Sequence, residues 1–445
     1  MIVGFRKEIR PMLRLGVPLA VAELGWMAMG FVDTVMAGRL GAAAIGAGAL
    51  GGMLFFPIAV CGTGMLLGMD TLVSQAFGAR DDDACRRTFI NGLWITLLIA
   101  PAVSLLLALT IPALRVTGTN PAVLDLLAPF LRALLWGILP LLFYTAFRRY
   151  LQAQNIVRPI TFAVVSANIV NFGGNWLLMY GHWGVPRMGL EGSGISTSFS
   201  RLYIALVLLI AVLRHERRLG NRIFHMDWRP DFSGIRRLLA LGFPSAMQIL
   251  FEGAVFAVVT VLASHLDEFS LAAHGIAVNV ISITYMVPLG ISSAAAVRVG
   301  QAIGRKDPRG IAVAGWTALL LAALFMGSAG IGFTIAPRWI ARLYTPDTAV
   351  IAASVTLLRI AAFFQIFDGL QVVATGAVRG LGDTRTPAYA HLIGYWIFGM
   401  PVAWLLCFHY AWGVSGIWVG LTIALVMIGL ILIFVWRRAL LNRAS

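Results

Sequence analysis

The chain has 445 residues, of which 59% are hydrophobic and only 12% are charged. A soluble protein carries about 25% charged residues, so this composition excludes an ordinary soluble domain and indicates a polytopic membrane protein. The net charge of +15 does not indicate nucleic-acid binding, because the arginines stand in short patches between apolar runs, and Cys61, Cys85 and Cys407 have no metal or disulfide spacing.

The apolar runs predict twelve transmembrane helices. Each span needs about 20 mostly apolar residues, and the runs are continuous rather than alternating, which favours helices over strands. The first run is too long for the apolar core of a signal peptide and lacks a cleavage motif. In chain order the predicted spans are 12–38, 46–72, 89–112, 124–148, 159–180, 191–212, 236–264, 272–297, 311–335, 348–378, 388–408 and 414–436.

The basic residues predict how these spans are oriented. With the N-terminus in the cytoplasm, 26 lysines and arginines fall in the two tails, in the even-numbered loops or at the span ends next to them. Cytoplasmic loops of membrane proteins carry such an excess, so we expect both termini to be cytoplasmic and the basic charge to face anionic lipids. Only five basic residues fall in the outside loops: Arg39, Arg115, Arg187, Arg338 and Arg342.

Two pairs of short motifs recur at one spacing. The second span ends in SQAFGARDD (74–82) and the eighth in GQAIGRKDP (300–308), while the first begins LGVP (15–18) and the seventh LGFP (241–244). Both pairs are 226 residues apart, which indicates a duplicated six-helix unit. We therefore expect an all-α fold of two pseudo-symmetric six-helix bundles. Their predicted extents are an N-terminal lobe at 1–213, a cytoplasmic linker at 214–235 and a C-terminal lobe at 236–445.

Four carboxylates fall well within the predicted spans, away from their ends: Glu23, Asp33, Glu252 and Asp368. Such groups normally mark an ion, proton or substrate path, or are paired with a buried partner. Oxygen-rich stripes suit a hard cation such as Na⁺, and a desolvated carboxylate can carry a proton, but interhelical hydrogen bonding also explains amide and hydroxyl stripes. Neighbours at helical spacing are Gln248 and Phe256 beside Glu252, Gln365 and Gln371 beside Asp368, Asn168, Asn171 and Asn175 together, and Ser193 with Thr197.

Several longer motifs run through the chain. They include GFVDTVMAGRLG (30–41), NWLLMYG (175–181), VGQAIGR (299–305) and QIFDGLQVVATGAVRGLGDTRTP (365–387). Together with SQAFGAR they resemble the motifs of multidrug and toxic compound extrusion (MATE) transporters of the NorM-like branch, over essentially the whole chain. The resemblance implies export of organic cations, such as drugs and dyes, in antiport with Na⁺ or H⁺ by alternating access. It also implies a bacterial inner-membrane location, a monomer among membrane lipids, and neither a cofactor nor a nucleic-acid partner.

The resemblance further implies two coupling sites. In the C-terminal lobe it matches Glu252, Asp368, Phe256 and Tyr285 to a cation site, with Na⁺ at the two carboxylates. In the N-terminal lobe it matches Asp33, Asn171, Asn175 and Thr197, with Ser193 as a further hydroxyl. Glu23 departs from the family, in which we would expect a neutral polar residue, so it either adds a coupling step or is paired. Further candidates for coupling or substrate contact are Gln248, Gln365, Gln371 and Asn279.

Two other classes of function remain open from the sequence. A lipid-linked oligosaccharide flippase has a related architecture, and it would need cationic residues for a pyrophosphate, for which Arg132, Arg201 and Arg359 are candidates. An intramembrane enzyme is the other class. The sequence has no GxSxG or HExxH motif and its seven histidines are scattered, so we expect no enzymatic activity.

Overall fold

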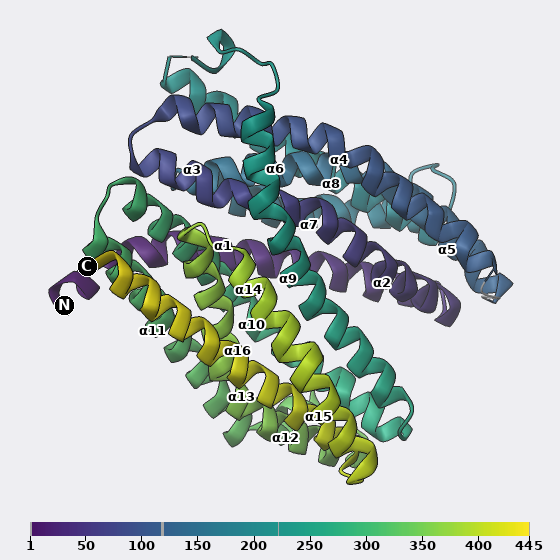
Figure 1. Ribbon diagram of the computed structural model, residues 1–445. Helices are drawn as coiled ribbons and strands as arrows, with labels where there is room; N and C mark the ends of the chain where they lie inside the picture. The colour runs from purple at the N-terminus through teal and green to yellow at the C-terminus, as the bar shows by residue number, and fades with distance from the viewer. Residues whose placement is uncertain (1, 117–119, 221, 445) are drawn as a thin grey trace. The chain divides into compact units, whose positions relative to one another are not determined.

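The computed structural model describes residues 2–116, 120–220 and 222–444, and it contains helices and no strand within these ranges (Figure 1). Position 221, in the predicted linker, lies outside the described residues. The helices in chain order are α1 (Ile2–Gly38), α2 (Ala42–Met65), α3 (Gly68–Gly78), α4 (Asp82–Val116), α5 (Pro121–Leu135), α6 (Ile138–Ala153), α7 (Arg158–Tyr180), α8 (Leu190–Arg218), η1 (Arg222–His225), α9 (Phe232–Ser264), α10 (Glu268–Gly304), α11 (Pro308–Ile335), α12 (Pro337–Arg342), α13 (Thr348–Gly380), α14 (Arg385–His391), η2 (Leu392–Gly399), α15 (Met400–Trp404), η3 (Leu405–His409) and α16 (Gly413–Ala444).

The number of candidate membrane spans agrees with the sequence prediction. Among the described residues, eleven helical segments are long and apolar enough to cross a membrane, with α2 and α3 forming one of them. The pair α5 and α6 is bent by 45° and makes the twelfth span if it is counted as one. The all-α prediction with twelve spans is therefore confirmed.

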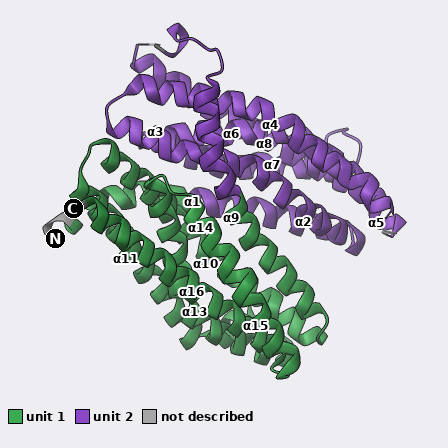
Figure 2. Cartoon of the chain, viewed as in Figure 1, with its two compact units in different colours: residues 1–20, 247–445 green, residues 21–246 purple. Residues whose placement is uncertain are grey.

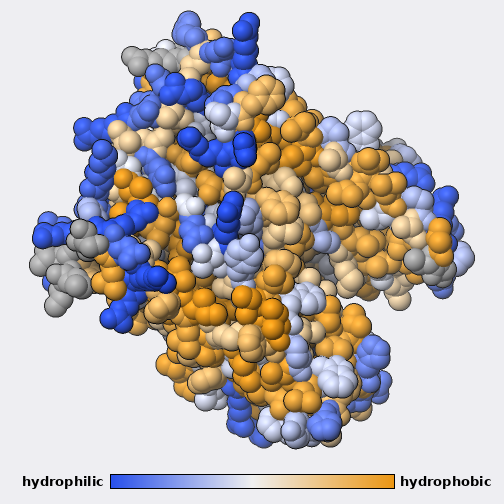
Figure 3. All heavy atoms as spheres, in the orientation of Figure 1, coloured by the Kyte–Doolittle hydropathy of each residue, from blue (hydrophilic) through white to orange (hydrophobic). Residues whose placement is uncertain are grey.

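The side chains on the helix surfaces suit a lipid environment. Phe31, Leu98, Ile169, Phe363 and Phe434 are large, apolar and exposed, and they come from five different helices. On the face drawn in Figure 3, apolar side chains run along the helices and hydrophilic ones gather near helix ends and loops. In water such a surface would be an aggregation liability, whereas in a bilayer it contacts the acyl chains.

Local sequence explains where several helices begin. Asp267 accepts a hydrogen bond from the Ser270 backbone N–H at 2.8 Å, and Asp307 accepts one from Gly310 at 2.8 Å. Asp347 accepts from the N–H groups of Ala349 and Val350. Each aspartate satisfies amides that the first helical turn leaves unpaired, so α10, α11 and α13 start at side-chain caps.

By its internal contacts the chain divides into two compact units, coloured in Figure 2: residues 1–20 with 247–445, and residues 21–246. In the first unit α13 packs against α10, α11 and α16, and in the second α8 packs against α5, α6 and α7. The two boundaries, after Ala20 and after Ala246, are again 226 residues apart. The units differ from the predicted lobes at these two helices. The first part of α1 belongs to the unit that holds most of the C-terminal lobe, and the first part of α9 belongs to the unit that holds most of the N-terminal lobe.

Glycine contacts show how this exchange repeats. A Cβ added to Gly64 would lie 2.6 Å from the Cβ of Ala246, inside the second unit. The pair shifted by 226 residues is Gly290 and Ala20, where an added Cβ would lie 2.4 Å from the Ala20 backbone nitrogen, inside the first unit. Only glycine permits so close an approach of two helices. The two halves of the chain therefore share this helix-packing contact as well as the short sequence motifs.

Candidate functional site

Glu252 lies at the centre of a polar cluster in the first unit. Tyr285 of α10 donates a hydrogen bond to its Oε1 at 2.9 Å, and Gln371 of α13 donates to the same oxygen at 3.3 Å. Gln248, one turn earlier on α9, donates to Oε2 at 3.1 Å. Helical spacing puts Gln248 and Glu252 on one face of α9, and donors from three helices therefore converge on one carboxylate.

Asp368 belongs to the same cluster. The Gln371 Nε2 group that contacts Glu252 also donates to Asp368 Oδ1 at 3.4 Å, so one side-chain amide joins the two carboxylates. Both are buried, with 9% exposure for Glu252 and 7% for Asp368. Gln371 Oε1 and Tyr395 Oη are buried without a hydrogen-bond partner. Unsatisfied oxygens beside two carboxylates are suitable ligands for a hard cation.

His391 is a member of this cluster that the sequence reasoning missed. Its Nε2 atom lies 3.7 Å from Glu252 Oε2 and 3.3 Å from Gln248 Nε2, and its Nδ1 atom lies 2.8 Å from the Pro387 carbonyl oxygen. The carbonyl accepts from Nδ1–H, which leaves Nε2 directed at the glutamate. The signal in the sequence was a histidine at the start of the eleventh predicted span, where ionisable groups are rare.

Three other candidates of the C-terminal lobe have different surroundings. Phe256 follows Glu252 by one turn on α9 and is half-buried. Gln365 donates to Thr284 Oγ1 at 2.7 Å, and its own Oε1 is buried without a partner. Asn279 accepts a hydrogen bond at 3.1 Å from Tyr344, which lies in the connection that leads to α13. It makes no hydrogen bond to Glu252 or Asp368.

The second unit holds the other predicted site as a closed hydrogen-bonded ring. Asn175 donates to Asp33 Oδ1 at 2.6 Å and Thr197 donates to Asp33 Oδ2 at 3.1 Å. Asn175 also donates to Asn171, and Asn171 donates to Thr197 at 3.4 Å. Ser193 is buried one turn before Thr197 on α8, outside this ring. The structure therefore brings together four of the five residues predicted here, on α1, α7 and α8.

Glu23 is paired in the structure. Its Oε1 accepts a hydrogen bond from the guanidinium of Arg148 on α6, and Arg148 also donates to Tyr144 Oη at 3.0 Å. Trp26 donates to the same phenol oxygen at 2.9 Å. Of the two alternatives for Glu23, this geometry favours a paired carboxylate over an additional coupling group.

Two further buried carboxylates of the second unit are also paired with arginine. Glu216 contacts Arg86 Nε at 2.8 Å, and Asp70 contacts Arg149 Nη1 at 2.9 Å. Glu252 and Asp368 differ from them. Among the described residues no lysine or arginine forms a salt bridge with either one, and their hydrogen bonds from Tyr285, Gln248 and Gln371 come from a phenol and neutral amides. Their negative charge is therefore not neutralised by a fixed cation.

The three arginines that a pyrophosphate site would need are divided between the two units. Arg132 and Arg359 are exposed on α5 and α13, and they belong to different units. Arg201 of α8 is buried at 7% exposure, with its guanidinium 4.3 Å from the centre of the Phe55 ring. A doubly charged pyrophosphate needs several cationic groups at one place. The first unit contributes one of these arginines, and in the second unit Arg132 is exposed whereas Arg201 is buried.

Comparison with known proteins gives one consistent result. The MatE family model matches residues 18–177 and 244–405. The chain is 36% identical over 446 residues to the probable multidrug resistance protein NorM of Mesorhizobium japonicum, covering 98% of this chain and 94% of that protein. It is 37% identical over 416 residues to the corresponding protein of Bradyrhizobium diazoefficiens, covering 92% and 89%.

Solved structures share the fold at lower sequence identity. The eukaryotic MATE transporter AtDTX14 superposes with a TM-score of 0.86 at 21% identity, covering 99% of each chain. A multidrug resistance MATE family transporter in an outward-facing conformation gives 0.88 at 17% identity, covering 98% and 97%. At these identities the likeness establishes the arrangement of the helices and leaves the site chemistry to this chain's own residues.

Proposed function

Because this chain belongs to the MATE family of multidrug efflux transporters, in its NorM-like branch, we propose that it exports organic cations in antiport with Na⁺ or H⁺. The energy comes from an ion gradient, and the coupling cation is a substrate of the transport cycle. The ion binds at Glu252 and Asp368, with Tyr285, Gln248 and Gln371 holding the glutamate in position. The Asp33 ring of the second unit is a second place for a cation or a proton.

The observation that supports this proposal is the pair of buried carboxylates without a fixed counter-ion. Glu252 and Asp368 share the Gln371 amide, whereas Glu23, Asp70 and Glu216 each have an arginine partner. When both are ionised they repel each other in a medium of low dielectric constant. A mobile cation or a proton removes that repulsion, so the site changes its charge state as an ion binds and leaves.

Coupling follows from the charge of the site. While the ion is bound, the cluster is less attractive to an organic cation, and once the ion has left, its negative charge favours the drug. A protein that alternates between inward-open and outward-open states then exchanges the two in opposite directions. Exclusion of like charge or a helix shift provides the coupling free energy, and no shared binding atom is required.

The groups around Glu252 suit either ion. Amide and phenol oxygens with a carboxylate are hard ligands of the kind that Na⁺ accepts. Either carboxylate can instead take up a proton, and the imidazole of His391 is a third group beside it that can do so. We keep both ions in the proposal, together with a monomer in the bacterial inner membrane and both termini in the cytoplasm.

We expect efflux of a fluorescent organic cation such as ethidium from vesicles that contain the purified protein. A Na⁺ gradient and a pH gradient are imposed separately, and vesicles without either gradient serve as the control. Efflux above that control under one gradient identifies the coupling ion. Folded protein that gives no efflux under either gradient contradicts the proposal and favours the flippase, whose test is movement of a lipid-linked oligosaccharide between leaflets.

A further inference from the structure

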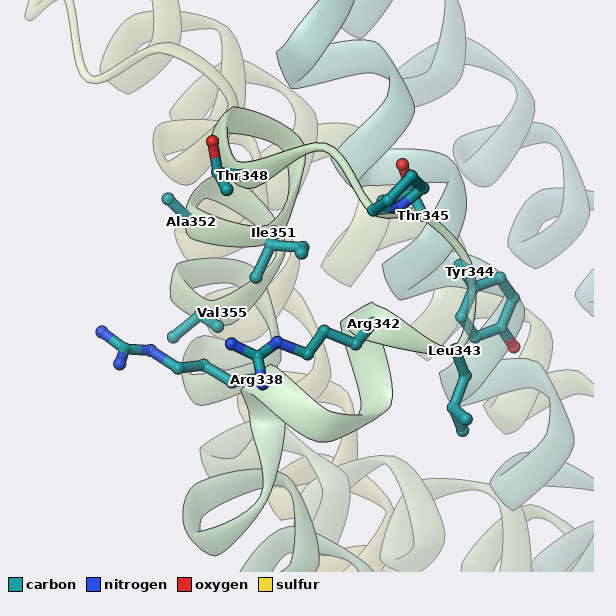
Figure 4. Close-up of a pocket in the computed structure, with 10 residues that line it drawn as sticks. Arg338, Arg342, Leu343, Tyr344, Thr345, Thr348, Ile351, Ala352 and Val355 are labelled. Atoms are coloured by element: carbon teal, nitrogen blue, oxygen red, sulfur yellow. The ribbon is translucent and has the colours of Figure 1, made fainter.

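A pocket of about 820 Å³ lies in the first unit, in the connection from α11 to α13 (Figure 4). Arg338 and Arg342 of α12 line it, and in Figure 4 both side chains extend in the same direction, toward the turn of α13 that carries Val355. The other lining residues are Leu343, Tyr344, Thr345, Pro346, Thr348, Ile351, Ala352 and Val355. The pocket thus combines two guanidinium groups and two threonine hydroxyls with an apolar wall.

The two arginines are unusual for their predicted side of the membrane. They are two of only five basic residues in the outside loops, and they stand four residues apart, on one face of a single helical turn. Outside loops of membrane proteins normally carry few basic residues. A pair concentrated in one pocket therefore indicates a requirement for positive charge at this place.

Neither arginine is neutralised by the protein. No salt bridge among the described residues includes Arg338 or Arg342, and both side chains are exposed. The nearest acid in sequence, Asp347, is engaged as the cap of α13 through Ala349 and Val350. Their charge is therefore available to an external anion.

The pocket lies between two candidate membrane spans. One span ends at Ile335 and the next starts at Thr348, so we expect the pocket to lie near the lipid headgroups. Trp339 and Leu343 beside it are exposed at 64% and 65%. Tryptophan and tyrosine concentrate at membrane interfaces, and exposed apolar side chains there enter the acyl region.

A third arginine nearby supports an anionic lipid as the ligand. Arg359 is exposed on α13 within a candidate span, one helical turn beyond Val355. An arginine facing lipid is costly unless its long side chain reaches a phosphate at the interface. Helical side chains lean toward the N-terminus of their helix, which for α13 is the direction of the pocket. We therefore expect its guanidinium to approach the anion from the membrane side.

We propose that this pocket binds the phosphate of an anionic phospholipid of the phosphatidylglycerol class, through Arg338, Arg342 and Arg359. The hydroxyls of Thr345 and Thr348 hydrogen-bond the phosphate and glycerol oxygens. One acyl chain follows the apolar wall of Ile351, Ala352 and Val355 into the bilayer. The lipid is favoured over a soluble anion because the apolar wall and the exposed arginine of the span would contribute nothing to a phosphate in water.

The proposed lipid site is separate from the coupling site. Arg359, the member of the proposed site nearest to Asp368 in sequence, lies 9 residues before it on the same helix, which corresponds to roughly 14 Å along the axis. Loss of lipid binding therefore need not remove ion binding, and the lipid proposal can fail while the proposed transport function holds.

The test is lipid retention by the purified protein in a neutral detergent, measured by native mass spectrometry with added phosphatidylglycerol, phosphatidylcholine or glycerol 3-phosphate. We expect the wild type to retain phosphatidylglycerol in preference to the other two. Each of Arg338→Gln and Arg342→Gln should weaken retention about fivefold, and the double variant roughly 25-fold. An arginine near an anionic membrane surface contributes about 1 kcal/mol, which corresponds to about fivefold in affinity.

The matched control is Arg115→Gln, which removes another exposed arginine of the same predicted side, at the end of α4. It should retain phosphatidylglycerol as the wild type does. Gel filtration and circular dichroism verify that each variant is folded. We expect folding to be retained because the substituted arginines are exposed. Equal retention by the wild type and a variant lacking all three arginines overturns the proposal. So does equal binding of phosphatidylcholine, and so does equal binding of glycerol 3-phosphate, which would indicate a soluble anion.

Discussion

Replacing Glu252 by glutamine is expected to reduce ion-driven efflux of an organic cation nearly to that of vesicles without protein. Glutamine keeps the size of the side chain and has one carbonyl oxygen, so it can still accept from Tyr285 or from Gln248, which contact different oxygens of the glutamate at 2.9 and 3.1 Å. It cannot carry the negative charge that attracts the coupling ion. Loss of a charge-assisted contact worth roughly 1.5–3 kcal/mol lowers the ion affinity roughly 10- to 100-fold.

The control for this variant is Glu268→Gln, which makes the same chemical change at an exposed glutamate in the first turn of α10. It should transport like the wild type. Both variants are measured as initial efflux rates at equal amounts of folded protein in the vesicles. Wild-type efflux by Glu252→Gln under the gradient that drives the wild type would show that the glutamate does not hold the coupling ion.

Replacing Glu23 by alanine is expected to cost about 3–5 kcal/mol of stability, because it leaves a buried arginine without its carboxylate. Arg148 has 5% exposure, and its remaining hydrogen bond to Tyr144 does not neutralise its charge. Thermal unfolding of the purified protein measures the loss. At a temperature where the variant is still folded, the ion that drives its efflux should be unchanged.

Two further variants make this result specific. Glu191→Ala removes an exposed glutamate in the first turn of α8 and should leave the stability unchanged. The double variant Glu23→Leu with Arg148→Met should recover most of the loss, because an apolar pair needs no compensation in a buried site. If Glu23→Ala instead unfolds like the wild type but depends on a different ion, then Glu23 takes part in coupling.

The sequence was sufficient for the helices and for the duplication, because both depend on local patterns. Long apolar runs define spans without knowledge of their neighbours, and the 226-residue spacing could be found from two short motifs. The same spacing relates Gly64 to Gly290 and Ala20 to Ala246, which the structure joins in two equivalent close contacts. The exchange of the first parts of α1 and α9 could not be predicted, since it depends on which helices pack together.

For the candidate sites, the sequence predicted which carboxylates lie within the spans better than it predicted which side chains contact them. Helical spacing placed Gln248 beside Glu252 on one helix, but His391 and Arg148 reach their glutamates from helices more than a hundred residues away in the chain. Such partners have no sequence signal in a single chain beyond being polar in an apolar run. For that reason the sequence could not decide that Glu23 is paired with an arginine while Glu252 is not.

The central claim is that binding of the organic cation and binding of an ion at Glu252 and Asp368 oppose each other, and ion movement driven by the drug tests it most directly. Vesicles with equal Na⁺ and equal pH on both sides receive a gradient of the organic cation, and indicators for Na⁺ and pH follow the ions. Because coupling free energy is reciprocal, the account predicts movement of one ion against the drug in the wild type and its absence in Glu252→Gln. Drug movement with no opposing movement of either ion would contradict it.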